Sequence, residues 1–402
     1  MATVLSNEQK ARLLTPDVKR LLAVLGDEAR VVGGAVRDVL LGCVPVDLDM
    51  ASSLEPEAVM SVLKDAGIKG VPTGIAHGTV TAVLNGKGYE ITTLRRDKDT
   101  DGRHAHVEFT DDWQADAERR DFTMNALSVD ASGILYDYVG GQADVAARHV
   151  RFIGDAAARI REDVLRILRY FRFQAFFGND TPDAAALEAC RVHARLVPTL
   201  SVERVAREML TLLESKDPEP ALQLMVQTGV LVQVLPEAKD FERLRALKKS
   251  ERKHALKPSG LTRLSSLLPP TKEAAHAVAK RLKLSRADAE RLEVLSELPL
   301  LLERSHSAQE VRRCLYAYGV SACTAAAALA GVEVFPLLAA WEAPEFPLRG
   351  KDLLSEGLAK GPALGNLLRV VEGWWIEGDF RADRDTCLAH AKELLDRNGK
   401  NP

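Results

Sequence analysis

In roughly the first 140 residues, short apolar runs typical of strands alternate with helical patterns, and glycine is frequent. Residues 22–32 lead into Gly33 and Gly34, the following AVRDVLLG has helical spacing, and PVDLDMA reads as a strand. Two Thr-rich runs, TVTAVL and YEITTL, are joined by Asn85-Gly86-Lys87-Gly88, which is a strong hairpin signal. These elements predict a small mixed sheet.

Amphipathic helices dominate the rest of the chain, because its apolar positions recur at helical spacing. Clear examples are Glu162–Phe177 (EDVLRILRYFRFQAFF), whose aromatic residues we expect in the core, and Val202–Leu213. The pattern predicts an α+β protein. We expect a mixed-sheet head over residues 1–140, a helical neck and body over 141–265, and a helical tail over 266–402.

One apolar stretch, Ala322 to Trp341, has about the length of a membrane span. It carries Glu333 and Pro336 and lacks basic flanks, which argues against insertion in a membrane. We therefore expect a buried helix that ends before the proline.

Composition is that of an ordinary globular protein: the 402 residues carry a formal charge of −3, and 46% are hydrophobic. This excludes a disordered tail protein. Five cysteines are scattered without a CxxC pair, which favours a reducing compartment and no disulfides. The first residues, MATVLSNEQKARLL, lack the basic and then apolar pattern of a secretory signal, so we expect a cytoplasmic protein without a membrane anchor.

Positive charge is concentrated in residues 242–263, which hold eight Lys or Arg and two acidic residues. Pro258-Ser259-Gly260 interrupts the stretch, so we expect a basic, partly loose connection. It offers a place for a nucleic-acid backbone, and a solvated linker is the alternative.

Asp47-Leu48-Asp49 is the most informative tripeptide. On a strand, residues i and i+2 point to one face, so the two carboxylates would lie about 7 Å apart at their Cα atoms. Carboxylate oxygens suit Mg²⁺ or Mn²⁺ bound together with substrate phosphates, and two such ions can serve an in-line displacement. Asp-x-Asp also occurs in ordinary solvated loops, so the motif needs its context.

That context includes Gly33 and Gly34 before a helix, with Arg37 one turn in, which would let backbone N–H groups approach a triphosphate. A simple chain reversal is the alternative. Another cluster, Arg119-Arg120-Asp121-Phe122-Thr123-Met124-Asn125, has guanidinium groups suited to phosphate or ribose contact. A surface ion pair would also explain it.

A further cluster opens the helix at Glu162. On a continuous helix Glu162, Asp163 and Arg166 fall within about 100° of arc, with Arg169 one turn further along. A carboxylate accepts from an exocyclic amine and a guanidinium donates to a ring nitrogen, so such a pair addresses the edges of cytosine and adenine. A network of salt bridges on an exposed helix is the alternative.

Taken together and in this order, these clusters resemble the class II tRNA nucleotidyltransferases, the CCA-adding enzymes, and their poly(A) polymerase relatives. VGGAVRDVLLGCVPVDLDMA is similar to GGxVRDxLLGxxxxDxD, ERRDFTMNALSVD to RRDxTxNAL, and EDVLRILRYFRF to the nucleotide-selecting EDxxR helix. SVERVAREMLTLL resembles the motif that braces the neck. The resemblance covers about residues 31–213, is extended by 229–237, and has nothing diagnostic past about 260.

The resemblance implies a polymerase-β-type head whose metal-binding, catalytic carboxylates are Asp47 and Asp49, with Glu90 in the hairpin as a candidate third. It places the following residues at the nucleotide: Gly33, Gly34 and Arg37 near the triphosphate, Arg120, Asp121 and Asn125 at the ribose and phosphates, Asp163 and Arg166 at the base, Glu162 holding Arg166, and Arg169 and Arg172 along the pocket. The segment Arg95 to Val107 matches a flexible loop that helps such enzymes switch from CTP to ATP, which argues against a CC-only enzyme.

We therefore expect a CCA-adding tRNA nucleotidyltransferase that adds C, C and A from CTP and ATP without a nucleic-acid template and releases pyrophosphate. Its partners would be tRNA, the two nucleotides and Mg²⁺, with two ions per site and Mn²⁺ as a substitute, and no obligate protein partner is implied. The alternatives are a poly(A) polymerase, a split CC-adding or A-adding enzyme, and a catalytically silent RNA-binding protein that keeps the fold.

Overall fold

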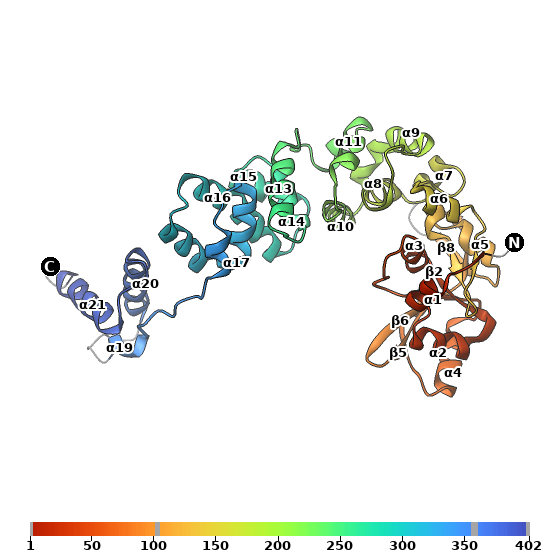
Figure 1. Cartoon of the computed structure of the whole chain (residues 1–402), viewed down its shortest axis with the longest axis horizontal. Coiled ribbons are helices and arrows are strands. Elements are labelled where there is room, and N and C mark those ends of the chain that lie inside the picture. Colours follow the sequence, from red (N-terminus) through yellow and green to blue (C-terminus); the bar gives the residue numbers. More distant parts are fainter. Residues whose placement is uncertain (1–2, 101–104, 355–360, 399–402) are drawn as a thin grey trace. The chain divides into compact units, whose positions relative to one another are not determined.

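The computed structural model of the chain describes residues 3–100, 105–354 and 361–398. It divides into two compact units, residues 1–236 and 237–402 (Figure 1). The sheet and the first set of helices belong to the first unit. In the described part of the second unit, the only regular elements are helices. The α+β prediction is confirmed, while the segment limits at residues 140 and 265 stay predictions.

The sheet of the first unit has eight strands in the order β1-β10-β9-β2-β3-β6-β5-β4. All neighbouring strands are antiparallel except β3 and β6, so the sheet is mixed as predicted. The strands are β1 (Thr3–Val4), β2 (Ala29–Val32), β3 (Met50–Ser52), β4 (Lys69–Gly74), β5 (Thr79–Leu84), β6 (Lys87–Thr93), β9 (Ser128–Val129) and β10 (Ile134–Tyr136).

The helices around this sheet are α1 (Asn7–Leu13), α2 (Pro16–Leu25), α3 (Gly34–Leu40), α4 (Pro56–Asp65) and α5 (Trp113–Glu118), with short 3₁₀ turns at Gly26–Glu28, Ile75–His77 and Thr123–Asn125. The predicted hairpin is confirmed as β5 and β6. Its turn is Asn85-Gly86, where φ is 50° and 78°, and such a left-handed pair is what the Asn-Gly signal supplies.

The predicted strand PVDLDMA begins later than expected, at Met50, so Asp47, Leu48 and Asp49 precede β3 instead of lying in it. The segment is still extended at its end, because the Val32 amide donates to the Asp49 carbonyl (3.0 Å). Leu48 is buried while Asp47 and Asp49 are exposed, so the two carboxylates flank an apolar anchor.

Helices follow from Gly141 to the end of the first unit. They are α6 (Gly141–Ala147), α7 (Ala156–Glu162), α8 (Arg166–Phe177), α9 (Ala184–His193), the 3₁₀ stretch Ala194–Thr199, α10 (Val202–Leu213), α11 (Glu219–Gln227) and α12 (Leu231–Val234). The predicted bounds of α10 are confirmed.

Aromatic packing fixes α8 against the segment that follows α5. The Phe122 ring lies 4.9 Å from that of Phe152 and 4.8 Å from that of Phe173 between centroids. Tyr170 and Phe171 are also fully buried. These side chains form core, as predicted, whereas Phe176 at the end of the helix is 39% exposed. The arginines of α8 are thereby held at a set position beside the sheet.

The continuous helix predicted over Glu162–Phe177 is wrong. Helix α7 ends at Glu162, Asp163 has extended backbone (φ −147°, ψ 108°), and α8 begins at Arg166. The Asp163 side chain accepts from the Leu165 amide (3.0 Å) and its carbonyl from the Arg166 amide (3.0 Å). Asp163 thus satisfies backbone donors at the start of α8.

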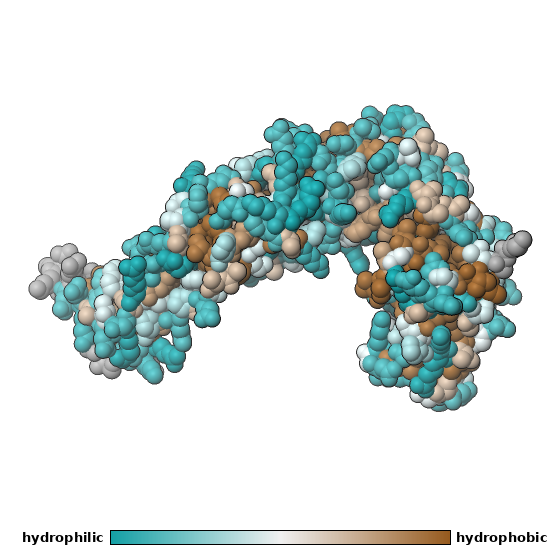
Figure 2. All heavy atoms as spheres, viewed as in Figure 1, coloured by the Kyte–Doolittle hydropathy of each residue, from teal (hydrophilic) through white to brown (hydrophobic). Residues whose placement is uncertain are grey.

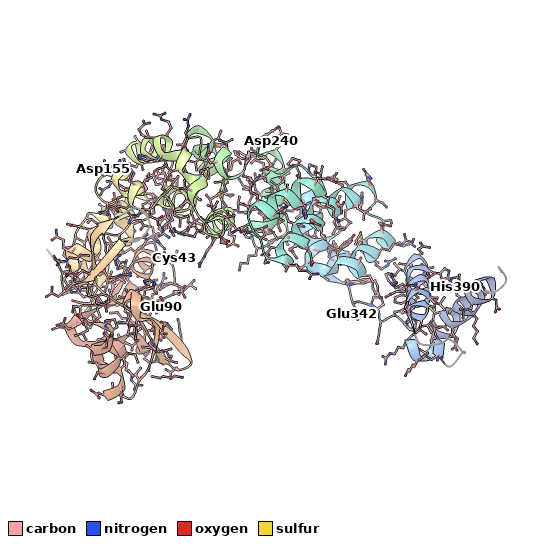
Figure 3. The ribbon with its side chains drawn as sticks, turned by 180° about the vertical axis from the view of Figure 1, so that it is seen from behind. Cys43, Glu90, Asp155, Asp240, Glu342 and His390 are labelled. Atoms are coloured by element: carbon pink, nitrogen blue, oxygen red, sulfur yellow. The ribbon has the colours of Figure 1, made fainter. Side chains whose placement is uncertain are left out.

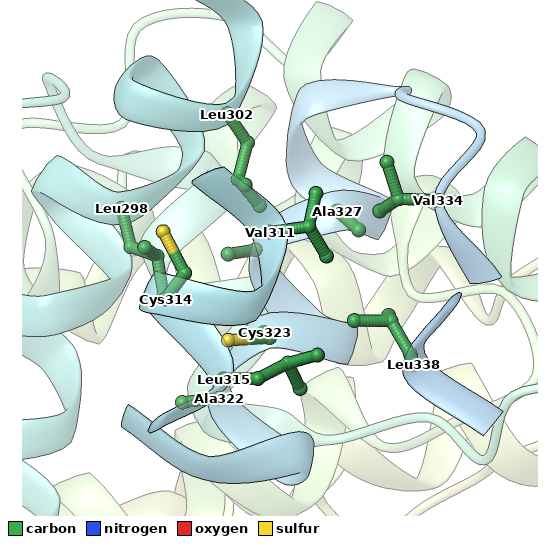
Figure 4. Packing of buried hydrophobic residues seen from close by; sticks show 11 residues of the cluster. Leu298, Leu302, Val311, Cys314, Leu315, Ala322, Cys323, Ala327, Val334 and Leu338 are labelled. Carbon is green, nitrogen blue, oxygen red and sulfur yellow. The ribbon is translucent and has the colours of Figure 1, made fainter. Parts of the chain in front are cut away.

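The second unit contains α13 (Glu242–Lys253), α14 (Gly260–Leu267), α15 (Lys272–Arg281), α16 (Arg286–Arg304), α17 (Ala308–Ala330), α18 (Phe335–Ala339), α19 (Gly350–Leu354), α20 (Pro362–Glu377) and α21 (Arg384–Asn398). Leu298, Val311, Cys314 and Leu338 lie within one of its apolar clusters, built by α16, α17 and α18 (Figure 4). The stretch Ala322–Trp341 thus contains the buried end of α17, which stops at Ala330, and Pro336 lies in the next helix, α18. Among the described helices, none is both long and apolar enough to cross a membrane.

The partly loose connection predicted for residues 242–263 is wrong, because most of this stretch is helix. Arg263 is only 2% exposed and forms an ion pair with Glu251 (2.7 Å). Arg243 donates to the Leu268 carbonyl (2.6 Å), and Lys248 is 8% exposed. Three of its eight cations therefore face the interior of the second unit.

The segment predicted as a loop over residues 95–107 forms a two-stranded sheet, β7 (Arg95–Thr100) with β8 (Ala105–Phe109). The turn between them, residues 101–104, lies outside the described residues.

Candidate active site

A cavity of about 580 Å³ opens beside the sheet in the first unit. Twelve of the fourteen predicted site residues line it: Gly33, Gly34, Arg37, Asp49, Glu90, Arg120, Asp121, Asn125, Asp163, Arg166, Arg169 and Arg172. They come from separate parts of the first 173 residues and are brought together by the sheet and by α8. Two predicted residues, Asp47 and Glu162, lie outside the lining.

The acidic corner of the cavity consists of Asp49 and Glu90. Strands β3 and β6 are parallel with Met50 opposite Ile91, so continuing this register by one residue puts Asp49 opposite Glu90. Facing residues of neighbouring strands point to the same side of a sheet, and both carboxylates line the cavity. Glu90 is labelled on its strand in Figure 3.

Asp49 is partly exposed as a residue, and the partial burial of its carboxylate in the cavity, together with the charges of Glu90 and Asp47, raises its pKa, while Arg120 acts in the opposite direction. Like charges held this close favour a cation between them. The described residues contain no group of three metal-binding side chains. A divalent ion such as Mg²⁺ often takes only one or two protein carboxylates together with substrate phosphates, so this corner fits one.

Arg120 lies beside the glycine turn. Gly33 has φ of 71°, and a Cβ built on it would lie 3.3 Å from Arg120 Nη1, so the turn accepts no larger side chain without displacing this guanidinium. Buried Asp116 holds Arg120 (2.9 Å) and also Arg119 (2.7 Å). Burial alone would raise the pKa of Asp116, but the charges of Arg120 and Arg119 outweigh it and lower that pKa.

Asp121 fixes Arg169 from the adjacent helix. Its Oδ2 accepts from Arg169 Nε (2.7 Å), and its Oδ1 accepts from the Phe122 amide (2.8 Å) and from Asn125 Nδ2 (3.1 Å). Burial would raise the pKa of Asp121, but Arg169 and these hydrogen bonds lower it. Both carboxylate oxygens therefore have partners within the protein.

Arg37 is held near the glycine turn by three groups. Its Nη1 donates to Asn125 Oδ1 (2.8 Å), its Nη2 pairs with Asp38 (2.7 Å), and the guanidinium lies 3.8 Å from the Phe177 ring centroid. It is 7% exposed, and this burial lowers its pKa.

Helix α10 braces three of the predicted nucleotide-binding residues. Glu208, which is buried, accepts from Arg172 Nε (2.6 Å), and Arg204 donates to Asp163 Oδ2 (2.7 Å). Glu208 also lies 4.0 Å from Arg169, so the resemblance of this segment to a neck-bracing motif corresponds to three contacts between α10 and the cavity wall.

Glu162 contacts Arg166 as predicted, but by a different route. The pair bridges the break between α7 and α8, and Arg166 Nη1 also donates to the Arg159 carbonyl (3.0 Å). Arg159 in turn holds Glu162 (2.9 Å). Glu162 therefore acts from behind the cavity wall, which explains why it does not line the cavity.

Sequence reasoning missed Asp116, Glu208, Arg204 and Arg159. Asp116 had a signal, because it precedes Arg119 and Arg120 by three and four residues, the spacing at which helical side chains meet. The partners of Glu208 and Arg204 are 36 and 41 residues away, and no local pattern relates them.

Two family models match the chain. A poly A polymerase head domain covers residues 29–151, and a probable RNA and SrmB-binding site of polymerase A covers residues 181–242. The mitochondrial CCA tRNA nucleotidyltransferase 1 of Danio rerio is 34% identical over 90% of this chain and 86% of its own length. The CCA-adding enzyme of Lactococcus lactis is 32% identical over 92% of this chain and 94% of its own length.

Solved structures show the same architecture. The Bacillus stearothermophilus CCA-adding enzyme in complex with CTP has a TM-score of 0.72 and 26% identity, covering 96% of this chain and 100% of that chain. The Thermotoga maritima CCA-adding enzyme complexed with tRNA has a TM-score of 0.64 and 22% identity, covering 98% and 100%. At that identity the second likeness concerns the fold alone.

Proposed function

The chain belongs to the class II CCA-adding tRNA nucleotidyltransferases, and we propose that the cavity beside its sheet is the site at which CTP and ATP are joined to the 3′ end of tRNA. The enzyme adds C, C and A without a nucleic-acid template. Each step joins the 3′ oxygen of the RNA to the α-phosphate of the nucleotide and releases pyrophosphate.

One observation carries the assignment of the site: among the described residues, the cavity has carboxylates without an ion-pair partner at one place and ordered guanidinium groups that are paired with carboxylates at another. The acidic corner comes from β6 and from the residue before β3, whereas the arginine edge, defined as Arg120, Arg166, Arg169 and Arg172, comes from α8 and from the segment after α5. Phosphoryl transfer needs positioning and charge compensation more than covalent chemistry, and this cavity supplies both.

Asp49 and Glu90, with Asp47 beside them, would hold the divalent ions. When bound, Mg²⁺ or Mn²⁺ neutralises negative charge on the phosphates and orients the attacking and leaving oxygens. Arg120 and Arg37, together with the Gly33-Gly34 turn, bind the triphosphate and keep the α-phosphate in place. Asp121 and Asn125 position Arg169 and Arg37 for this task.

Asp163 and Arg166 select the base. Cytosine and adenine both present an exocyclic amine, which donates a hydrogen bond to a carboxylate. Uracil and guanine present a carbonyl at that edge, which cannot donate. Arg166 donates to the adjacent ring nitrogen. Arg204 holds Asp163 and Glu162 holds Arg166, so each of the two side chains is positioned by a partner for this selection.

The exposed cations of the basic stretch 242–263 bind the tRNA backbone. Five of the eight point outward: Arg245, Lys249, Arg252, Lys253 and Lys257. Binding to phosphates through such groups depends steeply on salt, so raising the salt concentration should weaken tRNA binding strongly. The inward Arg243, Lys248 and Arg263 support the fold instead.

We place the enzyme in the cytoplasm because Cys43, Cys190, Cys314, Cys323 and Cys387 are all unpaired in the structure. Three relatives carry the word mitochondrial in their names. Imaging of a tagged protein in its own cell would decide between the compartments.

The deciding assay incubates the purified protein and Mg²⁺ with a tRNA that ends before CCA, with CTP alone, ATP alone or both. We expect two C with CTP alone and complete CCA with both nucleotides. Long A tracts on any RNA would instead identify a poly(A) polymerase, and addition that stops at CC with both nucleotides would identify a CC-adding enzyme.

A further inference from the structure

The segment Cys43–Val46, here the CVPV loop, leads from α3 directly to Asp47 and exposes apolar side chains. Val44 is 71% exposed and Val46 is 82% exposed. Among the described large apolar side chains, the next most exposed is Val192 at 59%. Figure 2 shows hydrophobic residues at several places on the head, so exposure alone does not mark a site.

The CVPV loop is held at both ends. At its start, the Cys43 amide donates to the Asp38 carbonyl (2.8 Å), and Arg12 donates to the Gly42 carbonyl. At its end, Leu48 is buried and Asp49 is tied to β2. Pro45 fixes φ in the middle. The two valines are therefore exposed to solvent on an anchored loop. Because the loop is already ordered, it loses less conformational entropy when a group binds to it.

Its position follows from the covalent chain. Val46 is three residues from Asp49, so its Cα lies at most about 10 Å from that of the acidic corner's Asp49. Cys43 is labelled in Figure 3 on the same unit as Glu90. The 3′ oxygen of the RNA must reach the carboxylates in every addition, which brings the last nucleotide of the RNA within reach of the loop.

We propose that Val44 and Val46 of the CVPV loop form the surface on which the terminal base of the tRNA rests while its 3′ oxygen attacks. This inference depends on the proposed function. The terminal base changes during the reaction, because it is first the encoded last base, then C, then C again. A surface that serves all three cannot read hydrogen-bonding edges, and apolar side chains provide contact without such reading.

The first test is kinetic and uses the double variant Val44→Ser with Val46→Ser. We expect KM for the tRNA to rise roughly tenfold, since contact with two valine side chains is lost, with KM for CTP and kcat within twofold. The rise should be similar for tRNA ending before CCA, in C, and in CC. The double variant Val44→Ile with Val46→Ile keeps apolar side chains and should have the tRNA KM of the wild type. Val4→Ser, at a side chain 55% exposed in β1, is the matched control.

The second test uses Cys43, which is exposed while the other four cysteines are buried. We expect bound tRNA that ends before CCA to slow alkylation of Cys43 by N-ethylmaleimide several-fold in the absence of Mg²⁺. A tRNA shortened by four further 3′ nucleotides should not protect it, and neither should CTP alone. The Cys43→Ser variant checks that the label reports this site.

Three outcomes would overturn the inference while leaving the proposed function in place. If the wild type completes CCA but the serine variant keeps its tRNA KM, the valines do not contact the RNA. If the shortened tRNA protects Cys43 equally, the RNA covers the loop by a part other than its end. If KM for CTP rises instead, the loop serves the nucleotide. A wild type that adds no nucleotide would overturn the proposed function itself, and this inference with it.

Discussion

The acidic corner and the arginine edge of the cavity differ in how their charges are balanced. Each arginine of the edge has a carboxylate or carbonyl partner, as in the pairs of Arg169 with Asp121 and Arg172 with Glu208. Within the described residues, no lysine or arginine forms an ion pair with Asp49 or Glu90. The positive charges of the arginine edge thus have partners within the protein, whereas the negative charges of the acidic corner have no ion-pair partner among the described residues.

This difference indicates how each region works. A guanidinium that is paired with a carboxylate adds little net charge. The arginine edge therefore contributes mainly directed hydrogen bonds, from N–H groups held at set positions. The corner carries excess negative charge beside the sheet, so under the proposed function it is the place for a cation that arrives with the nucleotide. Changes to the corner should therefore abolish chemistry with little cost in stability, and changes beneath the edge should cost stability as well.

The largest effect on activity is expected for Asp49→Asn. We expect kcat to fall by about 10³-fold or more, because one carboxylate of the metal site is lost. The same change should raise the melting temperature slightly. A raised pKa means that the charged form is disfavoured in the folded state, so ionised Asp49 lowers stability at pH 7 and its removal relieves this. Single-nucleotide addition and thermal unfolding measure the two effects.

Asp65→Asn, at an exposed position at the end of α4, is the matched control and should change neither quantity. Glu90→Gln sharpens the test, and we expect a loss of about 10²-fold in kcat if Asp49 and Glu90 act together. An unchanged kcat in Glu90→Gln would remove Glu90 from the site and leave Asp47 as the partner of Asp49.

Asp121→Asn should affect both stability and activity. Removing one member of a buried ion pair typically costs 3–5 kcal/mol, and we expect about 2–3 kcal/mol here because the Arg169 side chain is 31% exposed. Activity should fall by about 10²-fold as Arg169 loses its position. Urea unfolding and addition assays measure these two changes.

The pH dependence of unfolding gives an independent check on Asp121. Its pKa in the folded protein is lowered, so the stability that it contributes is present above the pKa of the unfolded chain and is lost as pH falls through the folded value. The window therefore lies below about pH 4. The wild type should lose stability there more steeply than Asp121→Asn, and parallel curves would contradict the ion-pair assignment.

Arg166→Ala should leave the rate of CMP addition within about tenfold and raise incorporation of UMP or GMP about tenfold, because one half of the base-reading pair is gone. Competition between labelled nucleotides on one tRNA measures the ratio. Arg191→Ala, at an exposed arginine of α9 paired with Glu188, is the control. Unchanged selectivity in Arg166→Ala would show that another group reads the base.

Sequence patterns predicted those parts of the fold that depend on local rules. Asn85-Gly86 predicted the hairpin because few residue pairs accept that turn, and the apolar spacing of α10 predicted its limits. The break at residues 163–165 escaped prediction because the helical spacing of apolar residues continues through it. Helix α7 ends where the Asp163 backbone becomes extended and its side chain accepts from the Leu165 amide, a local competition that periodicity does not register.

Twelve of the fourteen residues predicted for the site line one cavity, but the residues that support them were not predicted. Glu162 and Arg166 do meet, yet across a helix break and not along one face. The basic stretch 242–263 was predicted to be partly loose because Pro258-Ser259-Gly260 interrupts it, but its Arg263–Glu251 pair lies inside the second unit. Such pairs depend on tertiary contacts, which composition and spacing do not specify.

The smallest effect is expected for Arg204→Ala, which tests whether the brace from α10 matters to the edge. Arg204 and Asp163 are 50% and 37% exposed, so the pair should contribute under about 1 kcal/mol to stability. Misincorporation should still rise about two- to fivefold, since a freed Asp163 samples positions that tolerate other bases. Arg204→Lys keeps the charge and should recover most of the selectivity. If instead selectivity stays unchanged in Arg204→Ala while that of Arg166→Ala falls, base reading belongs to Arg166 alone and Asp163 serves only to start α8.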